Sequence, residues 1–367
     1  MKLTMPRAEL VSLIGKIQSV VPSKPAIPIL SNVLIEAREG QIILSATDLT
    51  VSMKAYADAN IVKEGSITLP ARRFFQLIRE LTSPEIEIEC GGGGIATIRC
   101  GSSHFKLNGM DKTEFPTLPD LNQAHTVSFT GNTLKHMLSK TVFAAARDDS
   151  RQVLNGLFTE IANGLLTFVG TDGKRLAKVQ HTIETDPSFK SEFIIPLKAV
   201  EEMIRIIEND DEVKFSIMKD KVALDIGSIC LISKLLAGQY PDVDRVIPDQ
   251  TQMKSIVLHR EELTQLLKQV SLFTSEMNYS VRFTFGDGDL QLQAMSSDIG
   301  EGRVNMPVDY GSDKLEIAFN PYFFIDILKH CKDETATFGI SDSFNPGMIT
   351  DSSDALYVIM PMRLSQD

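Results

Sequence analysis

The stretch Leu165–Ala177 reads LLTFVGTDGKRLA, an apolar run followed by a Thr-Asp-Gly turn and two basic residues. It predicts a strand to Gly170 and a sharp turn at 171–173, because glycine accepts a positive φ and aspartate bonds to its own backbone. Similar segments lie on either side, IILSATDL at 42–49 and LQLQAMSSD at 290–298. Successive turn aspartates are 124 and then 126 residues apart, and they are Asp48, Asp172 and Asp298.

Two further patterns repeat in the same order and at the same spacing. An apolar strand, a Pro or Asn stop and an amphipathic helix occur as ITLPARRFFQLIREL at 67–81, FIIPLKAVEEMIRII at 193–207 and IAFNPYFFIDILKHC at 317–331. A short apolar strand follows each of them, at 105–107, 231–233 and 358–360. Three patterns with one period indicate three copies of a domain of ordinary size. We predict an α+β fold with domains at 1–122, 123–249 and 250–367, each with two helices packed on one face of antiparallel sheet.

Apolar residues at helical spacing predict two helices in each copy. The chain is expected to place them at Pro6–Val21, Ala71–Leu81, Asn132–Arg147, Leu197–Asn209, Arg260–Phe273 and Pro321–Lys332, with Asn132 as a helix cap. Strands are expected at Ile29–Ala37 and Gln41–Ala46. The glycines at 91–94 predict a hairpin rather than a phosphate loop, because a strand follows them instead of Gly-Lys-Ser/Thr and a helix.

The composition is that of an ordinary globular protein, with 43% hydrophobic and 23% charged residues among 367. No segment approaches the roughly 18 apolar residues of a membrane span. Residues 1–10 lack the apolar core of a signal peptide. The four cysteines are scattered without a C-x-x-C spacing, which argues against a zinc site or a disulfide framework. We therefore expect a cytoplasmic protein.

Charge is unevenly distributed along the chain. The formal net charge is −11, yet the six predicted helices together are positive. This segregation favours helices that face a polyanion, although each helix alone is also consistent with a solvated amphipathic face. The sequence contains no helix-turn-helix, zinc-finger or aromatic RNA-binding pattern. Any contact with nucleic acid is therefore expected to involve phosphates and to be independent of sequence.

The sequence shows no catalytic constellation. The six histidines form no HExxH pattern, and there is no G-x-S-x-G elbow, Walker motif or dinucleotide fingerprint. Asp48, Asp172 and Asp298 could be imagined as metal ligands, but one aspartate per turn is far more often a turn former. We expect no catalytic residue, no metal and no cofactor.

Signature stretches along the whole chain resemble the family of bacterial DNA polymerase III beta subunits, the sliding clamps. They are PILSNVLIEA at 28–37, ATDL at 46–49, TLPARRFF at 68–75, FPTLPD at 115–120, VLNGLF at 153–158, TDGKRLA at 171–177, SKLLAGQYPDVDRVIP at 233–248 and VIMPMRL at 358–364. The resemblance implies a head-to-tail homodimer that forms a closed ring, with helices inside and sheets outside. It also implies a ring that encircles duplex DNA, tethers the replicative polymerase and has no enzymatic activity. Expected partners are DNA, the polymerase, the clamp loader and other proteins with a clamp-binding motif.

The resemblance and the charges suggest three sets of functional residues. The expected DNA contacts are Lys24, Arg72, Arg73, Lys135, Lys140, Arg147, Lys198 and Arg205. The expected dimer interface is Arg73, Phe105, Leu107, Leu272, Phe273, Asp298 and Glu301. The expected groove for partner peptides is Leu154, Thr171, Gly173, Lys174, Arg175, Leu176, Pro241, Val246, Phe344, Val358, Met360, Pro361 and Met362.

The chain departs from the family pattern at two places. Lys174 stands where a histidine is associated with the family, and Ser296–Arg303 carries only two acidic residues, Asp298 and Glu301. Two alternatives to a ring remain open at this point. One is a monomeric, acidic, multi-domain protein-binding scaffold. The other is an enzyme whose site forms between the copies from residues without a local motif.

Overall fold

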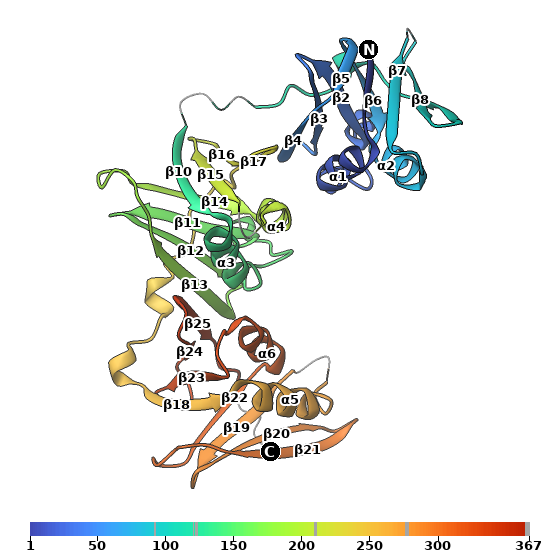
Figure 1. Cartoon of the computed structure of the whole chain (residues 1–367). Coiled ribbons are helices and arrows are strands. Elements are labelled where there is room, and N and C mark those ends of the chain that lie inside the picture. Colours follow the sequence, from blue (N-terminus) through green and yellow to red (C-terminus); the bar gives the residue numbers. More distant parts are fainter. Residues whose placement is uncertain (92, 120, 122–123, 209–210, 276–278, 364–367) are drawn as a thin grey trace. The chain divides into compact units, whose positions relative to one another are not determined.

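The structure is a computed structural model that describes residues 1–367 except 92, 120, 122–123, 209–210, 276–278 and 364–367. Within the described residues there are six α-helices, two in each copy (Figure 1). They are α1 (Arg7–Ile17), α2 (Ala71–Glu80), α3 (Gly131–Val142), α4 (Leu197–Ile206), α5 (Arg260–Ser271) and α6 (Pro321–His330). In Figure 1, α1 lies beside α2, and α5 lies beside α6.

Each copy repeats one unit twice, a strand, a helix and three strands; the first copy adds one short strand between its two units. The first copy contains β1 (Lys2–Pro6), β2 (Asn32–Arg38), β3 (Gln41–Thr47), β4 (Val51–Asp58), β5 (Asn60–Lys63), β6 (Gly65–Pro70), β7 (Glu85–Cys90), β8 (Ile95–Cys100) and β9 (Ser103–Asn108). The second contains β10 (His125–Thr130), β11 (Gly156–Ala162), β12 (Leu165–Thr171), β13 (Arg175–Thr182), β14 (Ser191–Pro196), β15 (Glu212–Ile217), β16 (Lys221–Ile226) and β17 (Ile229–Lys234). The third contains β18 (Lys254–His259), β19 (Val281–Gly286), β20 (Asp289–Ser296), β21 (Gly300–Pro307), β22 (Leu315–Phe319), β23 (Thr335–Ile340), β24 (Gly347–Thr350) and β25 (Ala355–Ile359).

Neighbouring copies share continuous antiparallel sheets. One eight-stranded sheet has the order β10-β15-β16-β17-β4-β3-β2-β6, and it joins the first two copies where β17 pairs with β4. The other has the order β14-β11-β12-β13-β25-β24-β23-β18, and it joins the second and third copies where β13 pairs with β25. The remaining sheets, β5-β1-β7-β8-β9 and β21-β20-β19-β22, belong to the first and third copies alone. Each copy thus contributes to two sheets, whereas the sequence analysis expected helices on one sheet face.

The chain divides into two compact units that do not follow the copies. One unit is Met1–Lys135 with Lys198–Leu235, and the other is His136–Leu197 with Leu236–Asp367. Each unit contains one of the eight-stranded sheets whole. The strand pairing that joins two copies therefore lies within a unit.

All six helices in the described part of the chain end earlier than the periodicity predicted, α2, α5 and α6 by one or two residues and α1, α3 and α4 by three to five. α1 ends at Ile17 instead of Val21. The chain continues in tighter turns, with the N–H groups of Val20 and Val21 bonding to the carbonyls of Ile17 and Gln18, and the proline after Val21 disfavours a helix at that residue. α3 ends at Val142 instead of Arg147, and the carbonyl of Phe143 just beyond it accepts a hydrogen bond from Arg175. Tertiary contact here overrides the helix propensity of the alanine run that follows.

Other local expectations have mixed outcomes. Asn132 is not the cap of α3, since the hydroxyl of Thr130 accepts the Thr133 N–H. The start of the predicted strand Ile29–Ala37 is a 3₁₀ turn, Pro28–Ser31, followed by β2. The hairpin after Cys90 is confirmed, with β7 and β8 antiparallel. The helix predicted to end at Asn209 ends at Ile206. The predicted domain boundary at 122/123 lies outside the described residues.

Candidate functional site

The turn at 171–175 forms as its sequence predicts. The Asp172 carboxylate accepts the N–H groups of Lys174 (2.9 Å) and Arg175 (3.0 Å), and Gly173 has a φ of +81°. The first copy repeats this geometry at Asp48, whose carboxylate accepts two backbone N–H groups of its own turn. The third copy does not, because its turn is closed by the Ile299 N–H bonding to the carbonyl of Ser296. Asp298 therefore occupies the equivalent place without the same turn-forming role.

This turn borders a small apolar cavity of about 150 Å³ at the meeting point of β12, β13 and β25. Leu154, Leu176 and Val358 are buried in a common hydrophobic cluster below it, whereas Val246 and Met360 are 41% and 38% exposed at its rim. Nine of the predicted groove residues line it, namely Leu154, Thr171, Gly173, Arg175, Leu176, Pro241, Val246, Val358 and Met360.

Three lining residues were missed by the sequence analysis. They are Arg151, Asp242 and Val243. Arg151 pairs with Asp149 (3.0 Å) and lies 3.1 Å from where a side chain on Gly173 would begin. The Arg151 guanidinium holds the pKa of Asp149 at about 2. The sequence analysis described the loop that carries Arg151 only as polar. Gly173, which lies opposite Arg151, was the one sequence feature that could have indicated a close approach at this place.

Four predicted groove residues do not line this cavity, namely Lys174, Phe344, Pro361 and Met362. Met362 instead donates its N–H to the carbonyl of Ala318 on β22 (2.7 Å). The other copies have the same isolated bridge to an edge strand, between Thr68 and Met110 and between Ile194 and Leu236. Met362 is thus a structural closing contact of its copy. Phe344 is 87% exposed, on a loop whose backbone N–H groups bond to Asp342.

Arg175 fixes the groove wall to the neighbouring helix. Its guanidinium pairs with Asp172 (3.1 Å) and with Asp326 of α6 (2.9 Å), and it lies over the ring of Phe323. Burial alone would raise the pKa of Asp326, but hydrogen bonds from Lys329 and Arg175 prevail and lower it. Because the Arg175 guanidinium is bonded to two carboxylates, it forms a rigid part of the groove wall.

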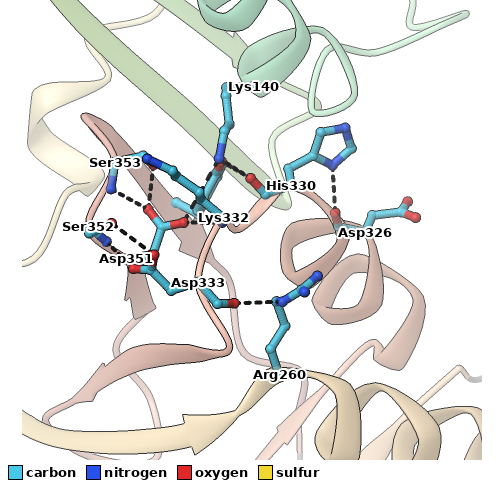
Figure 2. Close-up of polar contacts among 10 residues, drawn as sticks. Lys140, Arg260, Asp326, His330, Lys332, Asp333, Asp351, Ser352 and Ser353 are labelled. Carbon is cyan, nitrogen blue, oxygen red and sulfur yellow. Dashed lines mark hydrogen bonds and ion pairs between the residues drawn. The ribbon is translucent and has the colours of Figure 1, made fainter.

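Lys140 is not available for the predicted DNA contact. Figure 2 shows its ammonium directed at the carbonyl of His330 and at Asp351, which lies 3.9 Å away. The side chain of Lys140 is only 9% exposed, and that of Asp351 is 0% exposed. Burial alone would raise the pKa of Asp351, but hydrogen bonds from Ser353 and Lys332 and the charge of Lys140 lower it. The spacing that placed Lys140 on a basic helix face could not show that a distant loop covers it.

The other predicted DNA contacts fall into two groups. Three of them bond to groups of the protein. Lys135 donates to the carbonyl of Ile207, and Lys198 donates to Asp48 and to the carbonyl of Val20. Arg205 donates to Glu202 and Ser19. The other four side chains are exposed, namely Lys24, Arg72, Arg73 and Arg147. Arg147 also takes part in an interaction within the protein. This second group stays the stronger set of candidates for contact with phosphates.

The predicted interface residues lie at two sheet edges. Phe105 and Leu107 are on β9, and β9 is the last strand of its sheet. Phe273 packs against the backbone of Gly302 on β21, the terminal strand of another sheet. Leu272 beside it is 73% exposed. Glu301 pairs with Arg303 of its own strand (3.4 Å).

The described residues contain no group of three or more His, Cys, Asp or Glu side chains placed to hold a metal ion. Among the same residues, no helix combines the length and apolar character needed to cross a membrane.

Three family models of the DNA polymerase III beta subunit match the chain in succession. The N-terminal domain model matches residues 1–119, the central domain model 128–242 and the C-terminal domain model 244–363. These ranges follow the order of the three copies. The domain limits that the sequence analysis gave remain predictions.

Curated relatives and solved structures agree with these matches. The beta sliding clamp of Chlamydia muridarum is 50% identical over the full length of both chains, and that of Salmonella typhimurium is 30% identical over 99% of this chain and 100% of its own. The crystal structure of the DNA polymerase sliding clamp from Pseudomonas aeruginosa with ligand matches with a TM-score of 0.95 at 29% identity, over 99% of this chain and 100% of that one. The Bacillus subtilis clamp matches with a TM-score of 0.94 at 25% identity, covering 100% of each chain. With three copies of one fold, shared sheets and these full-length matches, the chain belongs to the bacterial beta sliding clamp family.

Proposed function

We propose that this chain is a DNA sliding clamp, a processivity factor that encircles duplex DNA and tethers the replicative polymerase. The full-length identity to beta sliding clamps carries this conclusion. Topological binding also fits the charges, because a closed ring cannot leave DNA sideways and needs few phosphate contacts. Such a function requires no catalytic group, no metal and no cofactor, and it belongs in the cytoplasm with the chromosome.

The sheet order supports ring closure between two chains. At the first joint the last strand of the second copy, β17, pairs with β4, and at the next β25 pairs with β13. Continuing this rule, β9 of one chain would pair with β21 of another. Both strands are terminal in their sheets, and an exposed edge readily pairs with a further strand. Two such head-to-tail contacts would close a homodimer.

An ion pair at the joint between the first and second copies indicates which residues would pair at the interface between two chains. Lys198, the second residue of α4, bonds to the turn aspartate Asp48 of the preceding copy. Arg72 is the second residue of α2, and Asp298 lies in the equivalent turn of the third copy. By this equivalence we expect Arg72 of one chain, next to Arg73, to pair with Asp298 of its partner.

We further propose that the apolar cavity beside Leu176 takes a short linear motif of partner proteins. Its size, its buried apolar floor and its exposed rim suit a few apolar side chains of a peptide. A peptide of the form Gln-x-x-Leu-Phe should bind with a Kd on the order of 1 μM, about −8 kcal/mol. A chain that ends before Met362 should lose this binding and stay dimeric, because the bridge to β22 that holds the end of β25 is gone. Equal binding by the truncated and full chains, in a fluorescence titration, would place the motif elsewhere.

Retention on circular against linear DNA tests the clamp proposal. With a matching loader, the protein should stay on nicked circular duplex and dissociate within minutes after the circle is cut. Equal dissociation from both would contradict encirclement. Sedimentation distinguishes the alternative of a monomeric acidic scaffold, since a ring of two chains has twice the mass of the chain.

A further inference from the structure

A second cavity lies next to the apolar cavity of the proposed peptide groove. It has a volume of about 570 Å³ and shares Pro241, Asp242 and Val243 with its neighbour as a common wall. Its other side is formed by the strands β11 and β14. A partner chain that leaves the apolar cavity across this wall enters the second cavity directly.

The walls of this second cavity carry an unusual pair of like charges. Glu160 on β11 and Glu192 on β14 are direct cross-strand partners, and both line the cavity. Like charges at opposed positions of antiparallel strands destabilise the pairing. Within the part of the chain that the structure describes, no Lys or Arg lies within ion-pair distance of either carboxylate. Asp242 and Asp244 on the opposite wall are already paired, with Arg245 (2.7 Å) and Lys178 (2.8 Å) respectively, so the uncompensated negative charge of the cavity comes from the two glutamates.

The floor of the cavity is aromatic. Phe158 and Tyr240 stack with ring centroids 5.2 Å apart and an interplanar angle of 19°. Both residues line the cavity together with the carboxylates. An aromatic surface next to carboxylates favours a cation, and Arg above all, because the guanidinium bonds to carboxylates and stacks on rings.

We propose that this cavity, named here the acidic annex and defined by Phe158, Glu160, Glu192, Tyr240, Asp242 and Asp244, binds a basic side chain that flanks the linear motif of a partner peptide. The inference rests on the proposed peptide groove and adds a rule for choosing partners. A cation between Glu160 and Glu192 relieves their repulsion, so binding gains from a cost that the unbound protein already carries. Partners with Arg or Lys next to the motif would be preferred over partners with neutral flanks.

Three peptides test this rule on the full-length protein. One carries Gln-x-x-Leu-Phe with neutral flanks, and the others add two arginines either before or after the motif. One of the arginine peptides should bind roughly tenfold more tightly than the neutral peptide at low salt, and the advantage should shrink at high salt because the pairs are partly exposed. In E160Q/E192Q this preference should disappear while the neutral peptide keeps its affinity.

A matched control removes the same charge elsewhere. The variant E184Q/E334Q changes two exposed glutamates that line neither cavity, and it should keep the arginine preference in full. If the preference persists in E160Q/E192Q, or if all three peptides bind equally, the annex does not bind the flank. Failure of the neutral peptide itself to bind would instead refute the groove, so the two failures are distinguishable.

Discussion

A buried lysine shows how one residue's role depends on what covers it. Lys140 lies on α3 in a helix that the sequence analysis interpreted as basic, yet its ammonium bonds to His330 and faces Asp351. Removing one partner of a buried ion pair leaves the other charge uncompensated, and this costs far more than removing a surface charge.

Lys140→Met should therefore lower the free energy of unfolding by roughly 3 kcal/mol. Lys24→Met, at an exposed loop position, should change it by less than about 0.5 kcal/mol. Urea denaturation of both variants measures the difference. A Lys140 variant as stable as the parent, but defective in DNA retention, would return this residue to the DNA surface.

His330 predicts a pH dependence of stability. Burial lowers the pKa of His330, helped by Lys140 and Lys329 and opposed by its bond to the Asp326 carbonyl and by the Asp326 charge. Its ring stacks on Phe143 at 4.0 Å. Because the unfolded chain takes up the proton first, stability should be full above about pH 6.5 and fall as pH drops below it.

In His330→Phe the stacking is kept and the titrating group is removed, so the stability change between about pH 7 and 5 should become smaller. His136, whose pKa burial also lowers, accounts for part of the remaining change. Thermal melts across this range give the comparison. His104→Phe, at an exposed site, should leave the profile as it was, and an unchanged profile in His330→Phe would refute the assignment.

At the scale of elements, terminal strands carry the proposed assembly. β9 and β21 end their sheets. Exposed Phe105 lies on β9, and exposed Leu272 follows α5 next to Phe273, which packs against Gly302 of β21.

The contact between the first and second copies combines the β17–β4 pairing with the ion pair of Lys198 and Asp48. The contact between the second and third copies combines the β13–β25 pairing with the ion pair of Arg175 and Asp326. A contact between two chains could be built in the same way.

Leu272→Ala with Phe273→Ala should turn the dimer into monomers. Leu272 would no longer bury its apolar area against the partner, which is worth about 1.5–3 kcal/mol for a large side chain. Sedimentation over a range of concentrations measures the dimer constant. The control Val257→Ala trims another exposed residue on β18, away from both edges, and should stay dimeric. A double variant that remains a dimer at every concentration would refute this interface.

At the scale of the whole molecule, DNA binding by a chain with a net charge of −11 fits a ring that makes few phosphate contacts and is retained by its topology. Of the predicted contacts, Lys24, Arg72, Arg73 and Arg147 present exposed side chains. Neither Lys24 nor Arg147 is among the predicted dimer-interface residues, so charge changes there are expected to leave the ring intact.

Lys24→Glu with Arg147→Glu should weaken binding to linear duplex and reduce the slope of log K against log salt by about 0.9 for each phosphate that the protein no longer neutralises. Fluorescence anisotropy at several salt concentrations gives the slope. The control Lys63→Glu with Lys219→Glu makes the same change of charge on exposed strand and turn positions. Equal slopes for both variants would show that DNA does not pass Lys24 and Arg147.

The sequence by itself determined the features that depend only on residues close together in the chain. Helix starts such as Ala71 and Arg260, and the turns at Asp48 and Asp172, depend on neighbours a few residues away. The period of the turns was enough to predict three copies, and the full-length matches bear this out.

Only the tertiary structure decided which distant groups meet. The carbonyl of Phe143, just beyond the end of α3, accepts a hydrogen bond from Arg175. Lys140 is covered by the end of α6 at His330 and by Asp351 between β24 and β25. Strands of successive copies form common sheets. The tertiary structure also brought Glu160 on β11 opposite Glu192 on β14. The sequence cannot show this pairing, because it depends on the register between two strands that are far apart in the chain. The physical reason is that burial and strand register depend on partners far along the chain, and local patterns carry no information about them.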